Sequence, residues 1–156
     1  MIRSTNVYGP RQQLFKIIPR SVISIKSGNK IPLHGGGTAV KSYIHIRDVS
    51  HGELLAMQKG KPGEIYHLSP DSGIAVKKVV QIICKKLHIP FAKAVTIAPE
   101  RLGQDAAYVI DSTKARKILG WQPAISFDMG ISEIIDWVTA NWSEIRKQPL
   151  EYIHKA

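Results

Sequence analysis

The sequence predicts a mixed α/β fold built as one region over residues 1–156. Short apolar stretches typical of strands alternate with longer segments in which apolar residues recur at helical spacing. An apolar content of 44% can supply a hydrophobic core. No repeat or low-complexity tract interrupts the pattern, and no linker longer than a loop divides the chain. We therefore expect strands and helices that pack into a single unit.

The chain is expected to open with a strand at residues 2–7, which ends at a Gly-Pro pair because both residue types break regular structure. Apolar residues at helical spacing then predict an amphipathic helix over about residues 13–27, closed by Gly28. Pro19 lies inside this segment, so we expect the helix to begin late or to kink there.

Two more strands are predicted at residues 30–34 and 42–46, with a loop of three glycines between them. Asp48 is the expected N-cap of a helix that runs to about residue 59, since a short acidic side chain can accept hydrogen bonds from free N–H groups. A buried strand follows at residues 65–68 and ends in a turn.

The second half begins with another amphipathic helix, marked by Val76, Val79, Val80, Ile83 and Leu87. Extended segments are predicted at residues 95–97 and 108–110. Ser112 is expected to cap a helix that ends at Gly120, and Ser126 to cap the last helix. The apolar face of that last helix is formed by Ile131, Ile134, Ile135, Val138 and Trp142.

The chain carries a net charge of +10, from 22 Lys and Arg against 12 Asp and Glu. A basic surface gains affinity for phosphates by releasing counterions. The basic residues are spread along the predicted helices, without interleaved aromatic residues or a recognition-helix signature. This pattern favours solvated helix faces or an anionic small-molecule ligand, and it disfavours nucleic acid as a partner.

Cys84 is the single cysteine and lies in the apolar pattern of a predicted helix. It predicts a buried thiol in a reducing compartment and excludes a disulfide framework. The six histidines show no metal-ligand pairing, so no metal site is expected. No signal peptide opens the chain and no apolar run approaches the roughly 20 residues of a membrane span, so we expect a cytoplasmic chain with no membrane partner.

Short motifs follow one another along nearly all of the chain. The first is Arg-Ser-Thr-Asn-Val-Tyr-Gly-Pro at residues 3–10. Further blocks stand at residues 16–19, 31–35, 43–49, 63–66, 101–105, 111–115 and 119–123. With these blocks the sequence resembles the nucleotide-sugar epimerases and dehydratases of the extended short-chain dehydrogenase/reductase family, most of all the members similar to dTDP-glucose 4,6-dehydratase.

Two motifs of this family are absent from the sequence. A dinucleotide fold carries Gly-x-Gly-x-x-Gly between a strand and a helix, because the glycines let the pyrophosphate approach the helix N-terminus. The glycine run at residues 35–37 has Val40 where the last glycine belongs, and none of the five tyrosines begins the family's Tyr-x-x-x-Lys pair. The resemblance therefore implies the substrate-binding C-terminal part of an extended enzyme with the last strands of its Rossmann sheet, the N-terminal Rossmann core being absent.

The resemblance implies that full-length members use NAD to oxidise C4 of the sugar, while the tyrosine of the missing pair accepts the hydroxyl proton. This chain is expected to hold no catalytic residue and not to bind NAD alone. Its expected ligand is a nucleoside diphosphate sugar, which it positions by the diphosphate and the base.

Eight residues are implied by the resemblance as contacts of the nucleotide sugar: Asn6, Lys16, Pro32, Leu33, His34, Lys41, Arg101 and Gln104. Lys16 and Arg101 are expected at the diphosphate, where the planar guanidinium can bind two oxygens. Residues 32–34 are expected along the base, partly through backbone groups, although His34 can equally be structural. Asn6 can donate to a phosphate or hold the loop that follows the first strand.

Three positions depart from the family pattern. Lys41 stands where an arginine commonly grips the diphosphate, and it offers a point charge without the planar fork. His67 replaces a usual asparagine, and Gln104 replaces a histidine that can titrate near neutral pH. The base, the sugar and the choice between dehydration and epimerisation therefore stay open.

Three functions are compatible with these observations. The first is the nucleotide-sugar-binding portion of an NAD-dependent 4,6-dehydratase or epimerase, catalytically incompetent in isolation. The second is a non-catalytic binding module or partner subunit, and the third is a basic nucleic-acid-binding domain. In the family, residues 2–7 and 65–68 are strands of the cofactor-binding sheet, so their uncovered edges predict self-association or pairing with a chain that carries the N-terminal half.

Overall fold

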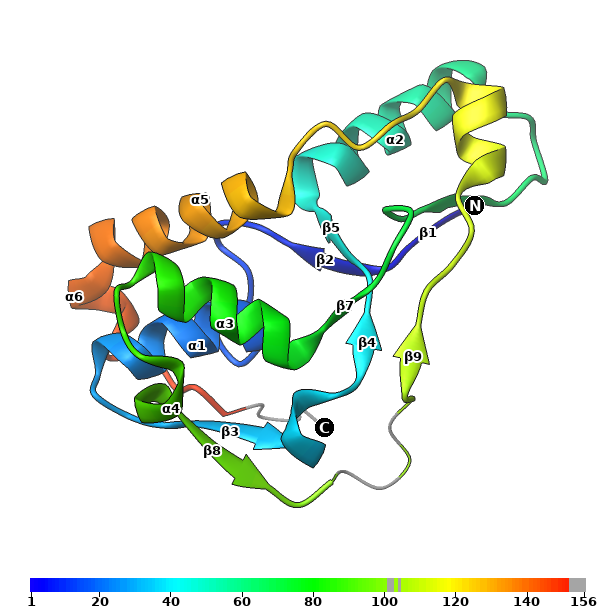
Figure 1. Cartoon of the computed structure of the whole chain (residues 1–156). Helices are drawn as coiled ribbons and strands as arrows, with labels where there is room; N and C mark the ends of the chain where they lie inside the picture. The colour runs from blue at the N-terminus through cyan, green and yellow to red at the C-terminus, as the bar shows by residue number, and fades with distance from the viewer. Residues whose placement is uncertain (101–102, 104, 152–156) are drawn as a thin grey trace, which may run out of the picture.

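The computed structural model describes residues 1–100, 103 and 105–151, which form two parts (Figure 1). The larger part, which we call the body, is built around helices α1 (Ile17–Lys26), α3 (Val76–Lys86) and α5 (Phe127–Ala140). The smaller part, which we call the arm, consists of strands β1 (Ile2–Ser4) and β6 (Tyr66–Leu68), helix α2 (Ile46–Lys59) and the helical turn η2 (Ala115–Leu119).

Short strands run through both parts, and most of them pair in parallel. β1 pairs with β6, β2 (Asn6–Tyr8) with β5 (Tyr43–His45), and β3 (Ile31–His34) with β8 (Val95–Ala98). β4 (Val40–Lys41) lies between antiparallel β7 (Ile74–Ala75) and parallel β9 (Ala107–Tyr108). The remaining elements are the turn η1 (Gly35–Gly37) and the short helices α4 (Phe91–Ala94) and α6 (Trp142–Ile145). The mixed α/β fold predicted from the sequence is confirmed.

The first predicted strand is divided because the chain changes its pairing partner at Thr5. The backbone N–H of Thr5 donates to Leu68 O at 3.3 Å, whereas that of Asn6 donates to Ser42 O at 3.1 Å. One extended stretch therefore pairs first with β6 in the arm and then with β5, which leads toward the body. Sequence periodicity reports an extended backbone but not which neighbour it pairs with.

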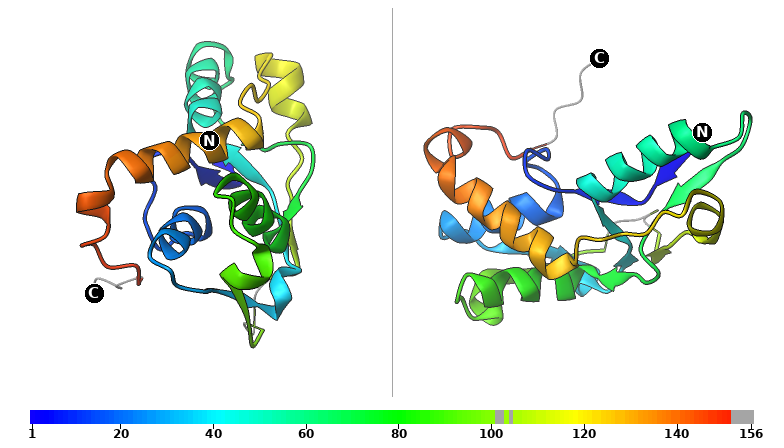
Figure 2. Two further views of the ribbon diagram at one scale, coloured as in Figure 1. Left: turned by 60° about the vertical axis from the view of Figure 1, so that its left-hand side comes forward. Right: turned by 90° about the horizontal axis from the view of Figure 1, so that it is seen from above.

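The body is held together by the packing of α1 against α3 and α5 (Figure 2). Its fully buried side chains include Val22, Val79, Ile83, Ile131 and Ile134. α1 begins late, as predicted, so that Pro19 falls in its first turn, where the backbone N–H has no partner within the helix. Gly28 closes this helix with a φ of 73°.

The arm has its own core between α2, η2 and the strand pair. Leu68, Leu119 and Trp121 are fully buried there. Gly52 lets α2 approach the strands closely, because a Cβ at this position would lie 2.5 Å from Leu68 Cδ1. The arm is thus a small packed layer of helix on sheet that extends away from the body (Figure 2).

The prediction that Asp48 caps α2 is wrong. His45 is the N-cap residue, and its Nδ1 accepts a hydrogen bond from Arg47 N at 3.3 Å. The Asp48 carboxylate instead accepts from Ala124 N at 2.9 Å and Ile125 N at 3.2 Å, and only 4% of this residue is exposed. Its partners lie in the segment before α5, which a local capping rule does not take into account.

The two serine caps have different outcomes. Ser126 caps α5 as predicted, since its Oγ accepts from Met129 N at 3.2 Å. The helix predicted after Ser112 begins directly behind it and ends at Gly120, as expected, but the Ser112 hydroxyl donates to Ser69 O at 2.9 Å instead of capping the helix. Cys84 is buried, as predicted. Within the described ranges, no helix is long and apolar enough to span a membrane.

Candidate functional site

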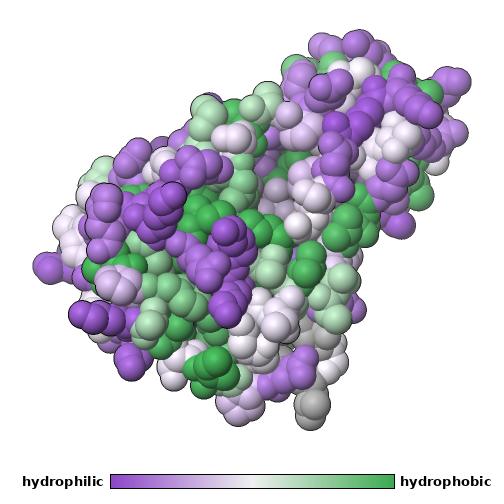
Figure 3. Space-filling model, viewed as in Figure 1, coloured by the Kyte–Doolittle hydropathy of each residue, from purple (hydrophilic) through white to green (hydrophobic). Residues whose placement is uncertain are grey.

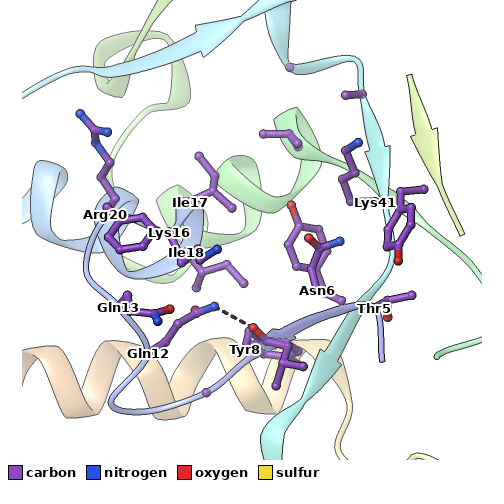
Figure 4. Close-up of a pocket in the computed structure, with 18 of the residues that line it drawn as sticks. Thr5, Asn6, Tyr8, Gln12, Gln13, Lys16, Ile17, Ile18, Arg20 and Lys41 are labelled. Carbon is purple, nitrogen blue, oxygen red and sulfur yellow. Dashed lines mark hydrogen bonds between the residues drawn. The ribbon is translucent and has the colours of Figure 1, made fainter. Parts of the chain in front are cut away.

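A cavity of about 870 Å³ lies between the turn after β2, the start of α1, and strands β3, β4 and β5 (Figure 4). This volume is within the range of small-molecule sites. Six of the eight predicted contact residues line it, namely Asn6, Lys16, Pro32, Leu33, His34 and Lys41. The other two, Arg101 and Gln104, lie outside the described residues. The structure therefore brings together six predicted residues from four separate places within residues 6–41.

Four Lys and Arg residues line the cavity. They are Arg11, Lys16, Arg20 and Lys41, and no Asp or Glu of the described chain is among the lining residues. Arg11 and Arg20 are not among the contacts predicted from the sequence. The spacing of four residues between Lys16 and Arg20 was the available signal for Arg20, because such residues share one helix face. This lining favours an anionic ligand.

The start of α1 adds to this positive potential. Lys16 is the N-cap residue of α1, no side chain caps the helix, and its first turn contains no acidic residue. The first N–H groups of a helix have no partner within the helix, and the helix dipole places partial positive charge at this end. An anion at this wall would meet backbone donors as well as side-chain cations.

Asn6 and Gln12 each form a side-chain hydrogen bond to the backbone at the cavity wall. Asn6 Nδ2 donates to Ser42 O at 3.0 Å, and Gln12 Nε2 donates to Val7 O at 2.7 Å. The Asn6 amide therefore joins β2 to the segment between β4 and β5, and Asn6 also lines the cavity.

β3 presents alternating residues to the core and to the cavity side. Leu33 is 2% exposed and packs in the core between β3 and α3, whereas Pro32 and His34 are half-buried. This alternation follows from the two-residue period of a strand. The side chain of Leu33 therefore contributes packing, while Pro32 and His34 stand on the opposite face of the strand.

His34 and Lys41 contact the segment between β8 and β9. His34 Nδ1 lies 2.9 Å from Pro99 O, and Lys41 Nζ donates to Asp105 O at 2.8 Å. Both residues still line the cavity. They therefore join the cavity wall to the segment in which the predicted contacts Arg101 and Gln104 occur.

Buried aromatic residues beneath the loop stay uncharged near neutral pH. Burial raises the pKa of Tyr43 to about 12, and burial also raises the pKa of Tyr8. His45 accepts from a backbone N–H through Nδ1, which places its proton on Nε2, 3.4 Å from Glu133 Oε2. Burial lowers the pKa of His45 despite this carboxylate. The pKa values of both tyrosines thus move away from neutral pH, and burial of His45 favours its neutral form.

The arrangement is suited to binding and orientation. Among the side chains that the structure describes, no three His, Cys, Asp or Glu are grouped so as to hold a metal ion. Basic side chains, free helix N–H groups and the half-buried residues of β3 surround the cavity. These groups can hold an anionic, partly apolar ligand by several contacts at once.

Comparisons with known proteins show the family to which the chain belongs. The sequence profile of the family described as GDP-mannose 4,6 dehydratase matches residues 1–134. The dTDP-glucose 4,6-dehydratase of Streptomyces antibioticus is 31% identical over 150 residues, which are 94% of this chain and 44% of that protein. The structure of DesIV, a dTDP-glucose 4,6-dehydratase from Streptomyces venezuelae with NAD bound, matches with a TM-score of 0.86 at 30% identity.

A second solved structure extends the comparison to epimerases. The UDP-glucose 4-epimerase of Thermotoga maritima, solved with UDP-glucose, matches with a TM-score of 0.84 at 26% identity, over 90% of this chain and 46% of that one. The match to DesIV covers 91% of this chain and 44% of that one, so the chain spans less than half the length of these relatives. The family resemblance that the motifs predicted is confirmed, and so is the predicted fold class. The fold matches the C-terminal portion of the dehydratases.

Proposed function

Since the chain belongs to the GDP-mannose 4,6-dehydratase family, we propose that its cavity binds the nucleoside diphosphate of a nucleotide sugar and orients the sugar for 4,6-dehydration or epimerisation. The observation that carries this proposal is the group of four basic residues around a cavity whose described lining contains no acid. A diphosphate is compact and strongly anionic, and such a lining stabilises it by charge and by hydrogen bonds.

The start of α1 is the proposed diphosphate site. Lys16 is the N-cap residue of α1 beside free backbone N–H groups, Arg20 follows in the first turn, and Lys41 lies across the cavity on β4 (Figure 4). Arginine can bind two phosphate oxygens at once, whereas lysine acts as a point charge. Arg101 and Gln104 are proposed, from the family motif alone, as further contacts of the ligand.

β3 is the proposed site of the nucleobase. Pro32 offers an apolar edge, His34 a ring with hydrogen-bonding nitrogens, and Leu33 its backbone groups, since its side chain is in the core. Asn6 is proposed to hold this wall against the ligand, because its amide already donates to Ser42 O between β4 and β5. Binding energy from the base and the diphosphate would then fix the position of the sugar.

Two features of this chain argue against NAD as its own ligand. The glycine run of η1 leads into strand β4, so no helix N-terminus follows it to receive a pyrophosphate. The sequence also lacks the Tyr-x-x-x-Lys pair. We therefore propose that the 156-residue chain alone, as one substrate-binding region, neither binds NAD nor turns over a nucleotide sugar.

The outer edge of β1 is the proposed place where a further chain continues the sheet. Met1 and Thr5 form backbone hydrogen bonds to β6, so the N–H and C=O groups of the alternate residues Ile2 and Ser4 point to the opposite side. In the described part of the chain no strand pairs with that edge. Unpaired edges readily accept another strand.

Exposed apolar residues on α2 support the same proposal. Leu54 is 48% exposed and Met57 is 84% exposed, and both lie on the helix that covers the β1–β6 pair. Parallel sheets are normally covered on both faces, with neighbouring helices packed side by side. The proposed partner is a chain carrying the N-terminal half, with a second copy of this chain as the alternative. A strictly monomeric protein in sedimentation over a wide concentration range would exclude the second copy.

Calorimetry with dTDP-, UDP-, GDP- and CDP-sugars tests the binding function. We expect one of these series to bind the wild-type chain, and Lys16→Ala to weaken that binding about ten-fold, since a hydrogen bond to a charged group contributes about 1.5–3 kcal/mol. Lys147→Ala is the matched control, because Lys147 lies in the exposed C-terminal segment and pairs with Glu144. Failure of every series to bind, or equal losses in both variants, would overturn the proposal.

Absorbance at the nicotinamide band tests the claim that the chain is incompetent alone. Neither NAD binding nor NAD reduction is expected with any of the four nucleotide-sugar series. Turnover by the purified chain would show that the missing motifs are not needed.

A further inference from the structure

Arg20 lines the cavity and also contacts the C-terminal end of the described chain. It lines the cavity, yet its Nη2 lies 2.8 Å from Glu151 Oε1, and Glu151 is not a lining residue. Of the four basic residues around the cavity, Arg20 alone has a carboxylate partner among the described residues. The charge of this guanidinium is therefore already paired within the chain.

Glu151 reaches Arg20 because the chain returns to the body after α6. Residues 146–151, which we call the C-terminal strap, begin with a turn in which Gln148 N donates to Ile145 O at 3.0 Å. Leu150 then packs against the same core as α1. Leu150 thus anchors the strap to the core of the body, and the ion pair of Glu151 joins the strap to the cavity wall.

We propose that the Glu151 carboxylate occupies Arg20 when the cavity is empty, and that a phosphate group of the ligand replaces it on binding. This inference rests on the proposed function and adds a regulatory element to it. Binding of a nucleoside diphosphate then frees Glu151 and loosens the C-terminal strap, while a docked strap lowers the affinity for the ligand.

The exchange is feasible because the intramolecular pair is weak. The Glu151 side chain is 78% exposed and that of Arg20 is 29% exposed, so water and salt screen their attraction. A phosphate at the start of α1 gives Arg20 a stronger partner, with two oxygens for its fork and the helix N–H groups beside it. The competition is therefore expected to change affinity only a few-fold.

Calorimetric titrations with uridine, thymidine and guanosine diphosphates test the exchange. Glu151→Gln is expected to bind about two- to five-fold tighter than the wild type, the range that an exposed ion pair can supply. Glu144→Gln is the matched control, because it removes the same charge from a nearby exposed carboxylate that pairs with Lys147. Arg20→Ala is expected to weaken binding, and adding Glu151→Gln to it should then produce no further change.

Tryptic cleavage after Arg146 and Lys147 reports the strap itself. We expect cleavage to accelerate a few-fold at saturating nucleoside diphosphate, and to be equally fast without ligand in Arg20→Ala. Equal affinities of Glu151→Gln and Glu144→Gln, or a gain from Glu151→Gln that persists in the Arg20→Ala background, would overturn the inference while leaving the proposed function intact. Wild-type protein that binds no nucleoside diphosphate would contradict the proposed function first and the exchange with it.

Discussion

The body and the arm both contain helices and strands, but the core of the body is surrounded more completely than that of the arm. In the body, α1, α3 and α5 surround a core whose buried residues range from Tyr8 to Ile145, so distant parts of the chain close it. In the arm, α2 and η2 cover a single strand pair, and the outer edge of β1 is unpaired within the described chain. On the face drawn in Figure 3, hydrophobic side chains gather between α3 and α5, whereas hydrophilic ones cover most of the arm.

This difference separates ligand binding from assembly. Most cavity walls belong to elements that pack on the body, such as α1 and β3. The arm contributes a sheet that a further strand can extend. The two parts meet at the start of α2, where Asp48 accepts from the segment before α5 and Arg47 pairs with Glu133 of α5. We expect damage to the arm to leave the cavity intact, and damage to this junction to affect both parts.

The largest expected effect comes from Trp121→Ala in the arm. Trp121 is fully buried, and its indole N–H donates to Asp48 O at 2.9 Å. Removing a large buried aromatic side chain leaves a cavity and lowers the free energy of unfolding by about 3–5 kcal/mol. Urea unfolding measures the loss, and hydrogen exchange should place it in the amides of α2 and β6.

Ile134→Ala in α5 is the matched change in the body, with an expected loss of about 2–5 kcal/mol. In Ile134→Ala, amide hydrogen exchange should accelerate in α1, α3 and α5, which share the core around Ile134. Binding of a nucleoside diphosphate should survive Trp121→Ala better than Ile134→Ala. If either variant lost amide protection from hydrogen exchange evenly over both parts, the arm and the body would unfold as one unit.

At the junction, Asp48→Asn is expected to lower the free energy of unfolding by about 1–3 kcal/mol, because the new NH₂ group faces a backbone donor and leaves it unpaired. The carboxylate normally accepts from Ala124 N and Ile125 N. Asp128→Asn is the control, since the Asp128 side chain is 75% exposed where it pairs with Lys86, and the change should alter stability by less than about 1 kcal/mol. Equal effects of the two variants would mean that the junction contributes no more than a surface ion pair.

Two glycine substitutions compare how rigidly the parts are packed. A Cβ on Gly130 of α5 would lie 2.5 Å from Tyr8 Oη, and one on Gly52 of α2 would lie 2.5 Å from Leu68 Cδ1. Alanine favours a helix by about 1 kcal/mol over glycine, but overpacking costs about 1–3 kcal/mol. A leucine methyl can rotate away more easily than a rigid phenol. We expect Gly130→Ala to be more destabilising than Gly52→Ala in thermal unfolding, and the reverse order would indicate a more tightly packed arm.

The sequence predicted features that depend on neighbouring residues. Helical periodicity placed α1 and α3, Pro19 set the late start of α1, and Ser126 caps α5 as predicted. Features that depend on distant residues were missed. Asp48 has the local signature of an N-cap, but its carboxylate finds donors far along the chain. The change of partner at Thr5 likewise requires knowledge of which strands are adjacent.

The site shows the same division. Family motifs identified six residues that line the cavity, because the motifs carry information about contacts that local patterns lack. Arg20 belongs to none of those blocks, and its role depends on the return of Glu151 past α1. The fold of the C-terminal segment, not a motif, brings this pair together.

The smallest expected effect is a pH dependence at the junction, centred on His45. Burial lowers the pKa of His45 from its ordinary value of 6.5, so the folded protein resists protonation that the unfolded chain accepts. The stability due to neutral His45 is therefore fully present above about pH 6.5 and is lost as the pH falls through the folded pKa. For one proton the slope cannot exceed about 1.4 kcal/mol per pH unit.

His45→Asn removes this titration while keeping an acceptor that can cap α2. Urea unfolding between pH 8 and pH 5 should give a shallower pH dependence for His45→Asn than for the wild type. His88→Asn, at an exposed position, should keep the wild-type slope. If acid instead stabilised the wild type relative to His45→Asn, the attraction between protonated His45 and Glu133 would outweigh burial, and the junction would be held by charge instead of packing.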